Sequence, residues 1–178
     1  MQSQIDTELK EMARIQALIQ LSALDSPYEA IFDTITAIAS DVCETPISLI
    51  SLVDEKRQWF KSNVGLPGIT ETDREYAFCA QTIKDSVTLE IEDATQDERF
   101  FDNPLVTGDP AIRFYCGAPI LLPMGETIGT LCVIDRKANV LNTYQKKTLE
   151  GLAKLVSQLL VARAVNHRRL ANIKSRNT

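Results

Sequence analysis

The sequence is poor in histidine and has no closely spaced cysteines. His167 is the single histidine among 178 residues, and it lies in a polar segment near the C-terminus. A histidine-dependent metal cluster, or a catalytic pair of cysteine and histidine, would have to use this one residue. The four cysteines are dispersed in apolar segments: Cys43, Cys79, Cys116 and Cys132. Because no two of them have Cys-x-x-Cys spacing, we expect buried thiols and no metal site.

Long apolar runs are also lacking. No stretch approaches the roughly 20 apolar residues that a membrane-spanning helix needs, and Met1–Lys10 has no basic-then-apolar signal pattern. We therefore expect a cytoplasmic protein with no membrane partner. The formal net charge of −5 disfavours nucleic acid as a partner, because the phosphate backbone is repelled. The basic segment 163–176 lacks interleaved aromatics, so we interpret it as a solvated helix end.

The remaining composition is that of an ordinary globular domain. Hydrophobic residues make up 44% and charged residues 24% of the chain, close to the averages for such proteins. The length is sufficient for one domain with a substantial core. We expect three segments: an N-terminal amphipathic helix at 1–23, a domain at 24–164, and a basic C-terminal tail at 165–178 that continues the last helix.

Long helices are predicted near both ends of the chain. Apolar residues recur at helical spacing within 3–22, and again in a second helix that ends near Cys43. We expect the Asp-Ser pair before Pro27 to cap this second helix, with the proline in its first turn. The last helix, with Thr143 as its predicted cap, has an apolar face that continues past the length needed to cover a sheet. Part of that face needs another partner.

Apolar runs bounded by turn residues predict the strands. The strands are expected at 47–54, 57–64, 87–91 and in two runs within 112–135. Between them we expect a loop at 65–74, a short helix at 76–85, a helical turn at 97–102 and a loop at 106–111. This order predicts an α+β fold, in which an antiparallel sheet carries long terminal helices on one face and short crossover segments on the other.

The stretch 112–135 is the predicted centre of the sheet. Its second run is apolar almost throughout, as expected of a strand that is covered on both faces. Its first run carries Arg113, Phe114 and Tyr115, which we expect to enter the same interior. On the neighbouring strand 57–64, the pattern does not decide which of two adjacent aromatics, Trp59 and Phe60, faces the core.

Several sequence blocks in this order resemble the GAF domain family, of the bacterial type found ahead of diguanylate cyclase or histidine kinase modules. The resemblance covers about residues 24–164. The blocks are Arg57-Gln58-Trp59-Phe60-Lys61, Glu71-Thr72-Asp73-Arg74-Glu75 with Phe78-Cys79-Ala80, Asp93-Ala94 with Asp97 and Arg99-Phe100, Asn103-Pro104, Ile112-Arg113-Phe114-Tyr115 with Gly117-Ala118-Pro119, and Gly129-Thr130-Leu131-Cys132-Val133-Ile134-Asp135.

The resemblance implies a GAF-like six-stranded antiparallel sheet with short helices and loops over a small-molecule pocket. It also implies a homodimer formed through the N- and C-terminal helices. Relatives commonly have a histidine two positions after the cysteine of the Phe-Cys-Ala block, where this chain has Gln81. A neutral amide replaces a protonatable ring there, so chemistry that requires imidazole is not expected.

The candidate ligand-binding residues come from these blocks: Phe78, Cys79, Asp93, Arg99, Phe100, Arg113, Phe114 and Tyr115. Arg113 is the sharpest feature, because a buried guanidinium needs an anionic partner. That partner is either an internal carboxylate, with Asp93, Asp97 and Glu75 as candidates, or a ligand. The aromatic rings either line a cavity or fill the core.

Three functions fit these residues. We expect a non-enzymatic sensory or regulatory domain that binds an unidentified small molecule and signals through a helix-mediated dimer. The first alternative is an enzyme similar to free methionine sulfoxide reductases, which would use Cys79, Cys116 and Cys132. The second is a ligand-free dimerisation module. The sequence identifies no cofactor and predicts no metal, and the signatures of bilin attachment and of cyclic-nucleotide recognition are absent.

Overall fold

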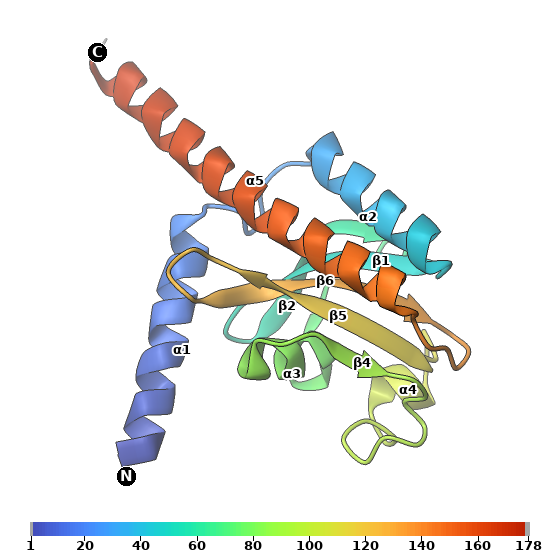
Figure 1. Cartoon of the computed structure of the whole chain (residues 1–178). Helices are drawn as coiled ribbons and strands as arrows, with labels where there is room; N and C mark the ends of the chain where they lie inside the picture. Colours follow the sequence, from blue (N-terminus) through green and yellow to red (C-terminus); the bar gives the residue numbers. More distant parts are fainter. Residues whose placement is uncertain (1, 177–178) are drawn as a thin grey trace.

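The core of the molecule is an antiparallel sheet of six strands, in the order β3-β2-β1-β6-β5-β4 (Figure 1). A computed structural model describes residues 2–176; Met1 and 177–178, the outermost positions of the predicted terminal segments, lie outside the described residues. The strands are β1 (Ile47–Val53), β2 (Arg57–Val64), β3 (Glu71–Asp73), β4 (Leu89–Ile91), β5 (Phe114–Leu121) and β6 (Thr127–Asp135).

Helical layers cover both faces of this sheet. The helices α2 (Ala30–Cys43) and α5 (Thr143–Arg176) lie on one face (Figure 1). On the other face lie α3 (Phe78–Asp85), which follows the 3₁₀ turn Arg74–Tyr76, α4 (Pro104–Thr107) and the connecting loops. This layering confirms the predicted α+β class and the six-stranded antiparallel sheet.

The strand β6 is buried along its whole length, because it lies inside the sheet with a layer on each side. This explains its continuous apolar run, as predicted. It pairs with β5 in the expected hairpin and with β1 on its other side. At Gly129 the two backbones are so close that a Cβ atom would come within 1.9 Å of the Ser51 carbonyl oxygen. Only glycine fits at this crossing.

Two separate cores result from the alternation of side chains along each strand. Tyr115 points into the core under α3, whereas Phe114 lies in the core under α2 and α5. The prediction that both enter one interior is therefore wrong, because adjacent residues of a strand face opposite layers. The same alternation resolves the aromatic pair on β2: Phe60 faces the α3 layer, and Trp59 packs, partly buried, on the other side.

Two short connections differ from the prediction. The predicted loop 65–74 contains β3, which pairs with β2 at the edge of the sheet. The helix α4 occupies part of another predicted loop, with Asn103 accepting a hydrogen bond from Leu105 N–H and Pro104 in the first turn. The predicted helical turn at 97–102 is present as a single hydrogen-bonded turn: the Asp97 carbonyl accepts from Phe101 N–H at 2.9 Å and from Phe100 N–H at 3.0 Å. Elements of three or four residues are too short to show a hydrophobic period.

The predicted helix caps are replaced by other contacts. Asn142, not Thr143, caps α5: its side-chain oxygen accepts from Gln145 N–H, and the Gln145 side-chain oxygen accepts from Asn142 N–H, both at 2.9 Å. This reciprocal pair is a capping box. The helix α2 begins three residues after Pro27 and has no side-chain cap, because the polar residues before it belong to a network described below.

The first helix, α1 (Gln2–Gln20), packs through its C-terminal half alone. Ile15 and Leu18 are buried, and Arg14 donates a hydrogen bond to the Val53 carbonyl at 2.6 Å. The N-terminal half extends away from the sheet, so α1 and α5 diverge from one another (Figure 1). Ile5, Leu9 and Met12 are 45%, 57% and 64% exposed. Within residues 2–176, no helix is long and apolar enough to cross a membrane.

Candidate functional site

The interior between the sheet and α3 gathers polar side chains around one thiol. Cys79 is the second residue of α3, and its sulfur accepts a hydrogen bond from Thr130 of β6 at 2.9 Å. Tyr115 of β5 donates to the same sulfur at 3.5 Å, and its hydroxyl bonds with the Thr82 hydroxyl at 3.1 Å. All four residues are buried. These contacts attach one face of α3 to two strands.

An aromatic stack closes this interior toward the loops. The rings of Phe78 and Phe100 stack with centroids 4.2 Å apart, and Phe78 tilts against Tyr115 at 5.2 Å. Tyr115 lies back across Gly117, where a Cβ atom would come within 2.0 Å of the phenolic oxygen. All three rings are buried, so a ligand entering here would have to displace the stack.

Arg113 borders this interior, and no carboxylate in the described part of the chain is hydrogen-bonded to it. Its guanidinium donates to the carbonyl oxygens of Val106 at 2.9 Å and Ile112 at 3.0 Å. Hydrogen bonds from Thr95, and to a smaller extent the charge of Arg113, hold the pKa of Asp93 below its ordinary value. Backbone carbonyls thus take the place of the internal carboxylate, which was one of the two predicted partners. They suffice because Arg113 is only partly buried and keeps contact with water.

The structure brings some predicted site residues together and separates others. Arg99 is exposed at the rim, where it pairs with Asp97 at 2.6 Å and lies over the Phe100 ring at 5.4 Å. Phe78, Cys79, Phe100 and Tyr115 share the interior; Arg113 and Asp93 border it; Phe114 lies on the opposite face of the sheet. The prediction missed the hydroxyls of Thr82 and Thr130, for which polar residues within apolar segments were the available signal.

Two thiols of this interior, Cys79 and Cys132, are hydrogen-bonded to one another. A hydrogen bond with Cys132 lowers the pKa of Cys79, against the opposing effect of burial. The same bond, together with burial, raises the pKa of Cys132. Cys116 lies in the core on the other face of the sheet, where burial raises its pKa to about 12. All four cysteines are free and buried, as predicted. Because a sulfoxide substrate has no direct access to a buried sulfur, this geometry does not favour the reductase alternative.

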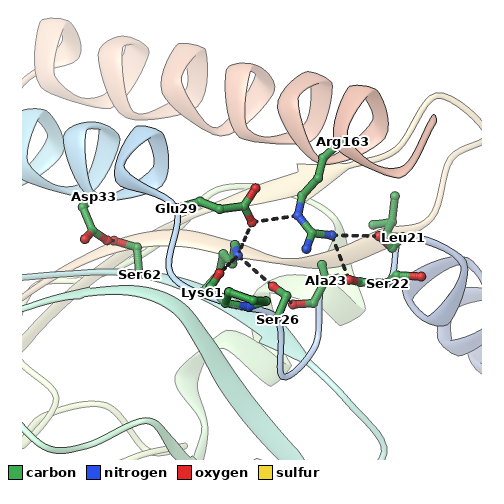
Figure 2. Close-up of polar contacts among 10 residues, drawn as sticks. Leu21, Ser22, Ala23, Ser26, Glu29, Asp33, Lys61, Ser62 and Arg163 are labelled. Carbon is green, nitrogen blue, oxygen red and sulfur yellow. Dashed lines mark hydrogen bonds and ion pairs between the residues drawn. The ribbon is translucent and has the colours of Figure 1, made fainter. Parts of the chain in front are cut away.

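A second polar cluster, the junction network, lies on the opposite face and was not predicted. Lys61 of β2 donates to Ser26 Oγ at 2.7 Å, to the Pro27 carbonyl at 2.9 Å and to Glu29 Oε2 at 2.5 Å (Figure 2). Arg163 of α5 donates to the same Glu29 oxygen at 2.7 Å. One carboxylate therefore joins the segment before α2, a sheet strand and the last helix.

A β-bulge in β2 directs Lys61 to this junction. Ile50 pairs with Ser62 while the next residue, Ser51, pairs with Phe60, so Lys61 is the extra residue. A bulge lets two consecutive side chains face the same layer. Accordingly, Ser62 also faces α2, where its hydroxyl hydrogen-bonds with Asp33. The signal available in the sequence was a lysine in a mostly buried strand, but its partner lies outside the strand.

Two buried cations share one carboxylate in the junction network. The side chains of Lys61 and Arg163 are 1% and 8% exposed, against 32% for Glu29. Burial raises the pKa of Glu29, but hydrogen bonds from both cations outweigh it, so the net shift is downward. Arg163 also donates to the Ser22 carbonyl at 2.8 Å, just after α1. The network thus links the end of α1 to α5.

These layers define an α+β domain, with long helices on one face of the sheet and a closed interior on the other. Residues 27–160 match the GAF domain family. The chain therefore belongs to the GAF domain family, which confirms the resemblance inferred from the sequence blocks.

Solved structures support the same fold. The GAF domain of an Acinetobacter phosphoenolpyruvate-protein phosphotransferase is 18% identical, with a TM-score of 0.62 over 88% of this chain and 96% of that one. A free methionine-R-sulfoxide reductase from Neisseria meningitidis, solved with its substrate, is 16% identical, with a TM-score of 0.63 over 84% of this chain and 87% of that one. At these identities the likeness concerns the fold alone.

One relative corrects the prediction that the protein is not an enzyme. A cyclic di-GMP phosphodiesterase of Pseudomonas aeruginosa is 41% identical over 159 residues, which are 88% of this chain. A relative this similar is named as an enzyme, so the prediction is wrong. That prediction rested on the buried thiols and on the missing histidine, and both concern only the chemistry of the interior around Cys79. The chain spans about 27% of the length of that relative.

Proposed function

We propose that this chain is a regulatory domain that senses a small molecule between the sheet and α3 and transmits its presence through α5. The observation that carries the proposal is the junction network, in which Lys61 and Arg163 meet on one oxygen of Glu29. Because Lys61 belongs to the sheet and Arg163 to the last helix, a shift of β2 would change the position of α5 relative to the sheet. A ligand that favours one position of β2 would thus favour one position of the helix.

The chemistry of the interior favours an uncharged ligand. Its walls carry aromatic rings, hydroxyls and thiols, while the charged side chains nearest to it, Arg113 and Asp93, border it and already have polar partners. A charged ligand would lose its hydration without gaining a counter-charge. Entry requires Phe78 and Phe100 to separate. Phe60 lies in the same core, one position from Lys61, and so connects the ligand to the bulge.

We propose a second copy of the chain as the partner of the exposed helix faces. On α5, Leu170 and Ile173 are each 58% exposed, beyond the part of the helix that covers the sheet. They lie three positions apart and therefore on one face. The outward apolar residues of α1 are available for the same purpose. A dimer would bury both sets and give the movement of α5 a partner to act on.

We further propose that the domain regulates cyclic di-GMP hydrolysis, as part of a phosphodiesterase similar to the Pseudomonas relative. The support is the 41% identity over 88% of this chain. We also propose, from the sequence alone, that the protein is cytoplasmic.

The test of regulation is the rate of cyclic di-GMP hydrolysis by the protein expressed in its natural host, with and without Glu29→Gln. A rate unaffected by this variant would contradict regulation through the network.

Native mass spectrometry of the protein purified from its natural host tests the sensing step. We expect a dimer that retains a neutral small molecule. Phe78→Trp overfills the interior and should abolish retention, whereas Phe101→Trp, at a position that is 54% exposed, should not. For the dimer, Leu170→Glu should yield monomers and Val140→Glu, on a loop residue that is 57% exposed, should not. A wild-type monomer would refute the partner assignment.

The closed aromatic stack favours a second candidate, a dimerisation domain without a ligand. In that case Phe78, Phe100 and Tyr115 are core residues, as their burial allows. The same mass spectrometry separates the two candidates. A dimer that never carries a small molecule, and whose assembly is unchanged by Phe78→Trp, would support the dimerisation domain and exclude sensing in this interior.

A further inference from the structure

A cleft of about 480 Å³ lies where α2 ends beside the last residue of β6, on the sheet face opposite to the aromatic stack. Its size falls in the range of small-molecule sites. The lining residues are Ser40, Asp41, Glu44, Thr45, Pro46, Asp135 and Lys137. Neither the interior around Cys79 nor the junction network includes any of these residues.

Asp135 is the residue that makes this cleft a candidate binding site. The residue is 4% exposed, and its Oδ2 atom is buried without any hydrogen-bond partner among the described residues. Alternation along β6 turns the side chain toward the α2 layer, since Val133 lies in the core on that side. An unpaired buried carboxylate oxygen is costly. Among the residues that line the cleft, Asp135 therefore carries an unused acceptor.

The surroundings of Asp135 add negative charge. Asp41 and Glu44 are exposed at the same cleft, and among residues 2–176 neither side chain forms an ion pair. The C-terminal end of α2, which carries the negative end of the helix dipole, points at this place. The opposing charge is the exposed ammonium of Lys137, which forms no ion pair with these carboxylates. With the three carboxylates of Asp41, Glu44 and Asp135 against one ammonium, the cleft is therefore net negative.

We infer that this cleft binds the ammonium or guanidinium group of an organic cation, with Asp135 as its buried acceptor and Asp41 and Glu44 as exposed ones. Such groups donate several hydrogen bonds and carry the required charge. A metal ion fits less well, because no group of three or more potential ligands among the described residues is close enough to hold one. An organic cation can span separated carboxylates, as a metal ion cannot.

Isothermal titration calorimetry of the intact protein tests this inference. The probe is 1,4-diaminobutane at low ionic strength, and 1,4-butanediol, which has the same length but no charge, is the control ligand. We expect heat of binding from the diamine alone, weakened by added salt. Asp135→Asn should raise the dissociation constant about tenfold or more, while Asp102→Asn, an exposed aspartate outside the cleft, should leave it unchanged.

A second pair of variants covers the case in which Asp135→Asn does not fold. Asp41→Asn and Glu44→Gln are on the surface and should weaken diamine binding together. A short peptide with one lysine between alanines distinguishes the source of the cation: tighter binding than the diamine assigns the site to a partner protein, and weaker binding assigns it to a free amine. Equal affinity of wild type and Asp135→Asn, or no heat from either probe at millimolar concentration, would overturn the inference.

Discussion

Glu29→Gln is the most informative single substitution, because it removes the one carboxylate of the junction network. Glutamine keeps the size and one acceptor oxygen of the side chain but not its charge. Lys61 and Arg163 would then be two largely buried cations without an ionised partner, since their side chains are 1% and 8% exposed. The substitution isolates the charge from the packing.

The expected loss of stability follows from burial. Removing one partner of a buried ion pair typically costs about 3–5 kcal/mol. The Glu29 side chain is 32% exposed, so solvent screens part of the interaction, and we expect a loss of about 2–3 kcal/mol. Lys61→Met in the same background removes one unpaired cation and should recover about 1 kcal/mol.

Urea unfolding at neutral pH, followed by circular dichroism, measures this difference. The control is Glu98→Gln, which makes the same chemical change at an exposed position and should alter the unfolding free energy by less than about 0.5 kcal/mol. If Glu29→Gln were as stable as Glu98→Gln, the network would not hold the structure together. The relay from β2 to α5 would then lose its physical basis.

The pH dependence supplies an independent check. The pKa of Glu29 is lower in the folded protein than the ordinary value of 4.5, through hydrogen bonds with Lys61 and Arg163 that outweigh burial. A lowered carboxyl pKa contributes stability that is complete above the unfolded value and is lost as the pH falls below it. The wild-type protein should therefore lose more stability on acidification below about pH 4.5 than Glu29→Gln does.

Further substitutions probe the sheet, α1 and the interior. Gly129→Ala should destabilise the protein by more than about 2 kcal/mol in thermal unfolding, because its Cβ would meet backbone at 1.9 Å, whereas Gly151→Ala has open space and should be neutral or stabilising. Glu11→Gln should reduce the loss of stability on acidification between pH 4.5 and about 2, because a hydrogen bond from Arg14 lowers the pKa of Glu11 to about 2. Urea titrations across that pH range test this. Tyr115→Phe should cost about 1 kcal/mol in thermal unfolding, and Tyr144→Phe, at a 70% exposed position, almost nothing.

Long elements could be predicted from the sequence because their hydrophobic period is repeated often enough to be read. The strand predicted at 57–64 coincides with β2, and the strand predicted at 47–54 ends one residue beyond β1. The short edge strand β3 and the single-turn helix α4 were not predicted, because three or four residues are too few to show a hydrophobic period. Their formation depends on pairing and capping partners that local composition does not reveal.

The candidate site was predicted in part for the same reason. The blocks that contain Phe78, Cys79 and Tyr115 meet because the fold brings α3 onto the sheet. Phe114 was assigned to the wrong layer although strand alternation was available to separate it from Tyr115. The hydroxyls of Thr82 and Thr130 were missed because their only local signal, a polar residue within an apolar segment, is weak: a buried threonine is common in any core.

The partners of buried charges could not be predicted from the local sequence. Lys61 and Arg113 are both cations close to mostly apolar strands, and each requires acceptors. Lys61 finds a carboxylate 32 positions earlier in the chain, and that carboxylate is shared with an arginine 134 positions after it. Arg113 instead finds a carbonyl oxygen seven positions away. The sequence therefore indicates that each cation needs a hydrogen-bond acceptor. Which group accepts is determined by the bulge in β2 and by the path of the loop before β5. Both depend on the completed fold.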